Sequence, residues 1–196
     1  MLLYGASGHA KVICSCLEAL NLTVTGLFDD NPNLLFLEGY SLLGKYNTEI
    51  YPTIPLIISI GNNTIRKHIS QSVYHTFGNV IHPSAILDRT ITIGVGTVVL
   101  HKAIIQRGSQ IGNHVIINTG AIIDHDCLVE DFVHISPNVT LCGGVKVGEG
   151  THIGAGTVVI PGITIGKGVI IGAGTVVIRN IPDNSTYVGN PAKKIK

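Results

Sequence analysis

Aliphatic residues recur at every sixth position through the second half of the chain. The run begins at Ile81, ends at Val177 and has no exception, which makes sixteen complete six-residue units. A helix favours apolar residues three and four apart, and a half-buried strand favours alternation, so neither accounts for a period of six. Glycine, asparagine and aspartate, which suit tight corners, stand between the apolar positions. The pattern therefore predicts a parallel β-helix built from short strands and turns.

This repeat resembles that of the left-handed β-helix proteins, in which three six-residue units close one triangular coil. Sixteen units then make roughly five coils, stacked about 4.8 Å apart. Residues 18 positions apart lie above one another in such a solenoid. His134 and His152 have this separation, so we expect their side chains to lie about 5 Å apart on one face.

The first part of the chain has a different pattern, in which short apolar runs alternate with amphipathic segments. This alternation predicts a small, Rossmann-like α/β domain with a parallel sheet. We expect strands at 1–4, 24–28 and 56–60, and helices at about 9–20 and 64–76. Three strands form a sheet of a size that suits one nucleotide better than a dinucleotide.

Polar turns follow all three predicted strands, and ligands of parallel sheets bind at the carboxyl ends of the strands. The first turn has the sequence GASGH, and we expect it to bind phosphate at the start of a helix. It lacks the full GxGxxG pattern, so a purely structural glycine turn is an alternative. The candidate substrate-binding residues in these turns are Ser7, Gly8, His9, Asp29, Asp30, Gly61 and Asn62.

Composition narrows the possible partners. The chain has 196 residues, a formal net charge of +1 and only 13% charged residues, which argues against nucleic acid or an anionic membrane as the main partner. The start of the chain lacks a signal-peptide pattern, and we expect a cytoplasmic protein. The cysteines have no zinc-type spacing, so we expect reduced thiols that fill small spaces. They are Cys14, Cys16, Cys127 and Cys142.

His125 is the best candidate for catalysis among nine histidines. It stands at a predicted corner between Asp124 and Asp126, and a carboxylate on one ring nitrogen makes the other more basic. A solvated corner without a catalytic role is the alternative. A zinc site of the gamma carbonic anhydrase kind is a further alternative, with His114, His134 and His152 as the imaginable ligands.

The turn GASGH, the uninterrupted repeat with His125-Asp126-Cys127, and the tail Gly189-Asn190-Pro191-Ala192-Lys193 occur together. Over essentially its whole length the chain resembles the bacterial NeuD/PglD-type sugar acetyltransferases. The resemblance implies acetyl-CoA as co-substrate, no tightly bound cofactor, and a homotrimer with shared active sites. It also implies His125 as general base and Asp126, which is Glu in the bacillosamine branch, as the acid that raises its basicity. Further implied site residues are Asn118 near the active site and, for acetyl-CoA, His134, Gly143, Ala155 and Ala173.

The resemblance implies a nucleotide-sugar-binding domain at 1–78, a catalytic β-helix at 79–180 and a tail at 181–196. The expected activity is N-acetylation of the 4-amine of a nucleotide-linked deoxy amino sugar. Sialic acid O-acetylation, a zinc hydratase and a non-catalytic scaffold are the alternatives. Cys127 occupies an inward position of the repeat, so we expect it to be a core residue and not a nucleophile.

Overall fold

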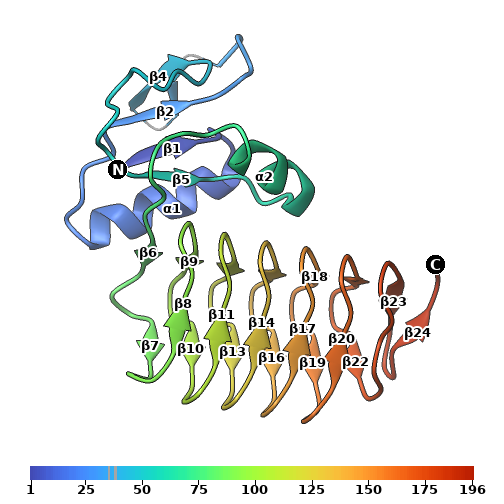
Figure 1. Ribbon diagram of the computed structural model, residues 1–196. Coiled ribbons are helices and arrows are strands. Elements are labelled where there is room, and N and C mark those ends of the chain that lie inside the picture. Colours follow the sequence, from blue (N-terminus) through green and yellow to red (C-terminus); the bar gives the residue numbers. More distant parts are fainter. Residues whose placement is uncertain (35, 38) are drawn as a thin grey trace.

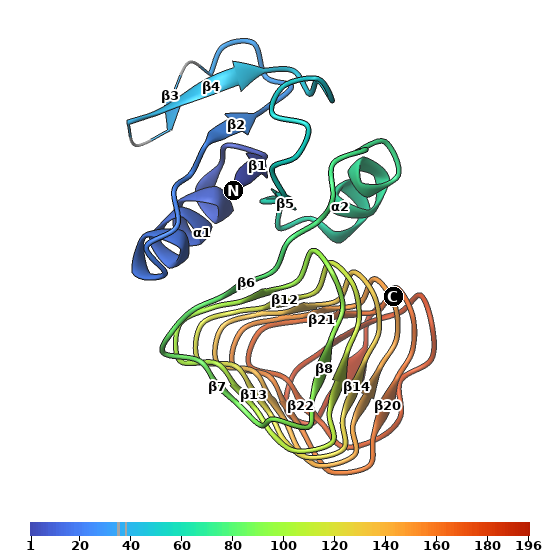
Figure 2. The ribbon, with the colours of Figure 1, turned by 60° about the vertical axis from the view of Figure 1, so that its left-hand side comes forward.

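The computed structural model describes residues 1–34, 36–37 and 39–196. A small α/β domain at the start of the chain lies against one side of a long triangular β-helix (Figures 1 and 2). The predicted fold class, a small parallel sheet followed by a left-handed parallel β-helix, is confirmed. In the view along the solenoid, the chain runs counterclockwise as it recedes from its N-terminal end, which is the left-handed sense (Figure 2). None of the helices in the described residues is long and apolar enough to cross a membrane.

The sheet of the small domain has the strand order β3-β4-β2-β1-β5. Its elements in chain order are β1 (Leu2–Tyr4), α1 (Gly8–Ala19), β2 (Gly26–Phe28), β3 (Phe36–Leu37), β4 (Tyr40–Gly44), β5 (Leu56–Ile58) and α2 (Asn63–Ser70). Strands β1, β2, β4 and β5 are parallel, and β3 pairs antiparallel with β4 at the edge.

The prediction of three strands is therefore wrong, because it missed β3 and β4. Strand β4 is only half-buried, so it lacks the continuous apolar run that marks the three central strands. The expectation that the sheet suits one nucleotide better than a dinucleotide rested on three strands, and the sheet has five. The second helix also ends earlier than predicted, at Ser70, where the Ser70 and Ser72 hydroxyls donate to carbonyls of the last turn.

The β-helix has three faces, each a sheet of two-residue strands from successive coils. Face 1 contains β6 (Val80–Ile81), β9 (Val98–Val99), β12 (Ile116–Ile117), β15 (His134–Ile135), β18 (His152–Ile153) and β21 (Ile170–Ile171), and continues into β23 (Thr186–Val188) and β24 (Lys193–Lys194). Face 2 contains β7 (Ile86–Leu87), β10 (Ile104–Ile105), β13 (Ile122–Ile123), β16 (Thr140–Leu141), β19 (Val158–Val159) and β22 (Val176–Val177). Face 3 contains β8 (Thr92–Ile93), β11 (Gln110–Ile111), β14 (Leu128–Val129), β17 (Lys146–Val147) and β20 (Thr164–Ile165).

Every aliphatic residue of the six-residue repeat is the second residue of one of these strands and points into the prism. From Val99 to Val177 all of them are buried, whereas Ile81, Leu87 and Ile93 of the first coil are half-buried. Strands pair with those 18 residues away, as His134 with His152. The interior is therefore a set of stacked aliphatic columns, which accounts for a core with few aromatic residues.

The small domain covers the first coils of face 1. The outward residues Val80, Val98 and Ile116 are buried there in one cluster with Ala10 and Ile13 of α1. Ile116 thus packs within its own chain. We name the three edges of the prism corner 1–2, corner 2–3 and corner 3–1 after the faces that they join.

Arg66 on α2 joins the small domain to corner 3–1. Its side chain is buried, and Nε and Nη2 donate to the carbonyls of His114 and Phe132 at 2.8 and 2.9 Å. Nη1 donates to the carbonyls of Ile60 and Gly61 in its own domain. Burial lowers the pKa of this guanidinium to about 10, so it stays charged at neutral pH. Its partners are neutral oxygens from both parts of the chain.

We predict that Arg66→Met lowers the free energy of unfolding by about 3 kcal/mol, because several buried carbonyls lose their donors. The matched control is Lys67→Met at the next position. Lys67 forms a partly exposed ion pair with Glu149, and its loss should cost less than about 1 kcal/mol. Urea unfolding of both variants measures the difference, and equal stabilities would contradict the role assigned to Arg66.

Candidate active site

His125 lies at corner 2–3, between β13 and β14. Its Nδ1 is 2.9 Å from Oδ2 of Asp126, and its backbone N–H donates to Oδ1 of Asp124 at 2.8 Å. Asp126 has a left-handed backbone with a φ of 57°, at a corner position that Gly108 and Gly144 occupy in the adjacent coils. The turn therefore holds the carboxylate beside the imidazole, as the sequence predicted.

The charge around His125 makes it a stronger base than a free imidazole. The hydrogen bond that Nδ1 donates to Asp126 raises the pKa of His125 most, and the nearby charges of Asp124 and Asp126 add to the shift. The ring is 60% exposed. Because Nδ1 is occupied by the carboxylate, Nε2 is the nitrogen that can take a proton from a bound molecule.

Gly143 lies one coil beyond His125, on the side of the free nitrogen. A Cβ at this position would collide with Nε2 of His125. The glycine therefore keeps the space beside the base open.

Cys127 is two residues from His125 but points inward. It is buried, its Sγ donates to the Cys142 carbonyl at 3.3 Å, and burial raises the pKa of its thiol. The prediction that Cys127 is a core residue is confirmed.

A second polar cluster lies where the small domain meets face 1. Nδ1 of His134 is 3.2 Å from the Gly61 carbonyl, and Nε2 is 3.2 Å from Nδ2 of Asn118. The ring of His152 lies 4.7 Å from that of His134, as the 18-residue spacing predicted, and the ring of His9 lies at 6.3 Å. Four residues of the predicted site, His9, Gly61, Asn118 and His134, are thus brought together.

The acidic pair after β2 serves the turn itself. Both oxygens of Asp29 accept backbone N–H groups, those of Ala6 and Asn31, at 2.7 and 2.9 Å. Asp30 accepts the Tyr4 hydroxyl at 2.9 Å and is exposed. Asp29 therefore shapes the GASGH turn, and Asp30 is the carboxylate with room for a ligand.

Three other predicted residues lie at the starts of the two helices. Ser7 precedes α1 without a side-chain capping bond, and a Cβ at Gly8 would meet no described atom within 4 Å. Asn62 caps α2, since its Oδ1 accepts the Ile65 N–H at 3.0 Å. The turn around Gly8 is thus open to a ligand, while the Asn62 side chain has a structural task.

The residues predicted for acetyl-CoA are divided between two edges and one face of the prism. Gly143 lies at corner 2–3 beside His125, whereas Ala155 and Ala173 are stacked at corner 1–2, and His134 is on face 1. A single chain does not bring these four residues together. Nor does it bring His125 to the small domain, which covers face 1 opposite corner 2–3 (Figure 2).

The imagined zinc ligands do not form a cluster. The His114 ring is stacked on Phe132 at 5.1 Å and lies edge-on to Phe77 at 4.4 Å, at corner 3–1. No group of three or more His, Cys, Asp or Glu side chains within residues 1–34, 36–37 and 39–196 is arranged to hold a metal ion.

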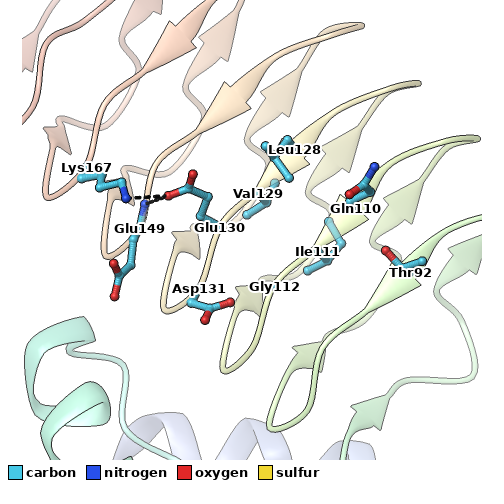
Figure 3. Close-up of a pocket in the computed structure, with 10 residues that line it drawn as sticks. All are labelled: Thr92, Gln110, Ile111, Gly112, Leu128, Val129, Glu130, Asp131, Glu149 and Lys167. Atoms are coloured by element: carbon cyan, nitrogen blue, oxygen red, sulfur yellow. Dashed lines mark hydrogen bonds and ion pairs between the residues drawn. The ribbon is translucent and has the colours of Figure 1, made fainter.

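A hollow of about 440 Å³ lies along face 3 and corner 3–1, away from His125. Its charged rim is formed by Glu130, Asp131, Glu149 and Lys167, and Lys167 forms an ion pair with Glu130 (Figure 3). Because Lys167 is already paired there, the hollow offers little free positive charge to an anionic ligand.

Comparison with known proteins follows the division into two parts. Residues 1–73 match the PglD N-terminal domain family, and residues 126–161 and 144–179 match the bacterial transferase hexapeptide family of six repeats. A solved structure of a perosamine N-acetyltransferase variant from Caulobacter crescentus, in complex with CoA and GDP-perosamine, is 36% identical. That match covers 100% of this chain and 96% of the other, with a TM-score of 0.95. This chain belongs to the NeuD/PglD-type sugar acetyltransferases.

Two further relatives are also described as acetyltransferases. The acetyltransferase domain of PglB from Neisseria gonorrhoeae, in complex with acetyl coenzyme A, is 35% identical with a TM-score of 0.90, over 99% of this chain and 98% of that domain. UDP-N-acetylbacillosamine N-acetyltransferase from Bacillus subtilis is 43% identical over 102 residues, 47% of each protein. The match to a second curated relative, an uncharacterised mimivirus protein, spans 19% of that protein. The matched regions thus span less than half the length of these curated relatives.

Sequence reasoning missed Arg66 and Tyr4 in this acetyltransferase. Arg66 lies on the more polar of the two helices, where a cation is ordinarily solvent-exposed. Tyr4 ends a buried strand and donates to Asp30. The one signal that could have marked Tyr4 is its place at the end of an apolar strand, directly before the glycine-rich turn.

We predict that Asp126→Asn lowers the pKa of His125, because the carboxylate that stabilises the imidazolium is lost while the ring stays hydrogen-bonded. Proton NMR titration of the His125 ring measures the shift. Asp124→Asn is the matched control and should lower the pKa less, since its effect on the ring is only through space. An unchanged pKa in Asp126→Asn would rule out the assigned pairing.

Proposed function

We propose that this protein transfers the acetyl group of acetyl-CoA to the 4-amine of a nucleotide-linked deoxy amino sugar. The observation that carries the proposal is the His125–Asp126 pair at corner 2–3, with Nε2 exposed beside Gly143. The relatives support both substrates, since the Caulobacter enzyme is described with CoA and GDP-perosamine and the Neisseria domain with acetyl coenzyme A.

The proposed chemistry is direct transfer. The amine lone pair attacks the thioester carbonyl while Nε2 of His125 accepts a proton from the nitrogen. The tetrahedral intermediate then collapses, its C–S bond breaks, and the CoA sulfur leaves and takes up a proton. The buried thiol of Cys127 takes no part, and binding both substrates side by side supplies much of the rate.

Face 2 supports a trimer, because its outward residues are apolar or β-branched throughout. Ile86 is 65% exposed, and Ile122 and Val158 are 37% and 38% exposed. The outward residues of face 2 are Ile86, Ile104, Ile122, Thr140, Val158 and Val176. Face 3 has Lys146 and Gln110 among its outward residues, and face 1 is covered by the small domain over its first coils. A continuous exposed apolar face of this kind indicates a subunit interface.

Three copies that turn face 2 toward a common axis would form a shared site. Corner 2–3 of one copy then lies next to corner 1–2 of its neighbour. His125 and Gly143 of one subunit would face Ala155, Ala173 and the small domain of the next. This arrangement accounts for the division of the predicted residues between separate edges of one chain. None of the four cysteines, all of which the structure describes, forms a disulfide, in keeping with the reducing, cytoplasmic location that we propose.

We predict that His125→Ala lowers kcat by about 10²- to 10⁴-fold, the usual contribution of a general base. Thiol release from acetyl-CoA, with a nucleotide-linked 4-amino sugar as acceptor, measures the change. The control is His68→Ala, because His68 is exposed on α2. A loss of only a few fold would remove His125 as the base. If sialic acid as acceptor gives thiol release and none of the amino sugars does, the protein is an O-acetyltransferase instead.

We predict that two inactive variants restore activity when they are mixed. His125→Ala lacks the base, and His134→Ala disrupts the cluster at the small domain. When equal amounts of the two variants exchange subunits at random, about a quarter of the wild-type activity should return. In a quarter of the junctions, a subunit with an intact His125 lies next to a subunit with an intact His134 cluster. No recovery after proven subunit exchange would show that each site lies within one chain.

A further inference from the structure

The buried Arg66 reaches the polar cluster at the small domain through one shared oxygen. Its Nη1 donates to the Gly61 carbonyl at 3.3 Å and to the Ile60 carbonyl at 3.0 Å. The same Gly61 oxygen lies 3.2 Å from Nδ1 of His134. A carbonyl oxygen has two lone pairs, so it can accept from both groups at once. The guanidinium thereby fixes an acceptor against which the His134 ring is oriented.

The neighbours of His134 require one tautomer of its ring. Because Nδ1 faces a carbonyl oxygen, which only accepts, Nδ1 must carry the proton. On the other side, the Asn118 amide is oriented by the Thr119 N–H, which donates to Oδ1 at 2.8 Å. Its Nδ2 therefore faces Nε2 of His134, and Nε2 must be unprotonated to accept.

Charge around the ring acts in the same direction. Burial, together with His152, His9 and Arg66, lowers the pKa of His134 to about 3. The Gly61 carbonyl is the one group that favours the protonated ring. A second proton on Nε2 would also oppose the N–H of Asn118. The ring is thus neutral throughout the range in which His125 titrates.

We propose that Arg66 is a positioning residue of the acceptor site: it fixes the Gly61 carbonyl, which holds His134 in the neutral Nδ1–H form, and His134 in turn orients the Asn118 amide. One hydrogen of the Asn118 Nδ2 is then left for the sugar bound at this cluster. In this proposal the His134 side chain lies on the acceptor side of the site, whereas the resemblance implied that His134 binds acetyl-CoA. The assignment of this cluster to the acceptor sugar rests on the proposed function, whereas the tautomer of His134 follows from these contacts alone.

A purely structural role of Arg66 is the alternative, since it also joins the small domain to corner 3–1. Asn63 allows the two roles to be separated. Its Nδ2 donates to the carbonyls of Gly150 and Thr151 at 3.0 and 3.1 Å, and its Oδ1 accepts from Nη2 of Arg66 at 2.8 Å. Asn63→Asp keeps this acceptor for the guanidinium but removes both donors to corner 3–1, so it loosens the junction and leaves the Gly61 carbonyl with its guanidinium donor.

The test is nitrogen-15 NMR of the histidine rings in the intact protein, with Arg66→Lys, Arg66→Met, Asn63→Asp and Lys67→Met as variants. In the wild type and in Asn63→Asp we expect His134 to show a protonated Nδ1 and a bare Nε2 from pH 5.5 to 8. In Arg66→Met we expect averaged signals from both tautomers. Arg66→Lys, which keeps the charge but has fewer donors, should fold if Arg66→Met does not and should show partial averaging.

Kinetics provide the second readout. KM for the nucleotide sugar should rise about tenfold in the folded Arg66 variants, as expected for loss of the one hydrogen bond from Asn118 to the sugar, while KM for acetyl-CoA changes less than twofold. Lys67→Met should change neither. An unchanged His134 tautomer in folded Arg66 variants overturns the proposal, as does a loss of the single tautomer in Asn63→Asp. If the wild type transfers no acetyl group, the proposed function fails, and the NMR result still decides the role of Arg66.

Discussion

The hydrogen-bonded register between coils is the constraint on which this structure depends. Each strand pairs with the strands 18 residues before and after it, so a residue's position within the coil decides its edge or face and its direction. This register places Gly143 above His125 and Ala173 above Ala155, and no local preference of those residues could do so. One inserted residue in a coil would move every later side chain out of its column. The site is therefore encoded by spacing as much as by residue type.

Much of the fold could be predicted because the repeat is longer than any local pattern. The aliphatic residue of every unit became the inward residue of a strand, and His134 and His152 lie side by side. The small domain was predicted less well. Its half-buried edge strand β4 has no strong period, and the early end of α2 depends on serine hydroxyls that compete for backbone carbonyls.

The parts of the site that escaped prediction are long-range contacts. Asp29 follows a strand, as a ribose-binding carboxylate would, yet it is used by the backbone of a turn 23 residues earlier. Arg66 is an ordinary helix residue in sequence, and only the meeting of α2 with corner 3–1 buries it. Neither contact leaves a periodic signal, because each depends on how separately formed elements meet.

His125 and His134 have opposite electrostatic environments. His125 is exposed between carboxylates, which raises its pKa and suits a group that must take up a proton. His134 is buried among histidines and an arginine, which keeps it neutral and suits a group that holds a neighbour in place. A trimer that turns face 2 inward would bring one of each to every junction, where His125 of one subunit faces the small domain of the next.

A crystal structure with CoA and a nucleotide-linked 4-amino sugar bound tests this account most directly. The account predicts that the sugar amine lies within hydrogen-bonding distance of Nε2 of His125 in one subunit, while the nucleotide contacts the GASGH turn of the adjacent subunit. A nucleotide and a reacting amine held by the same chain, or an amine placed away from His125, would contradict it.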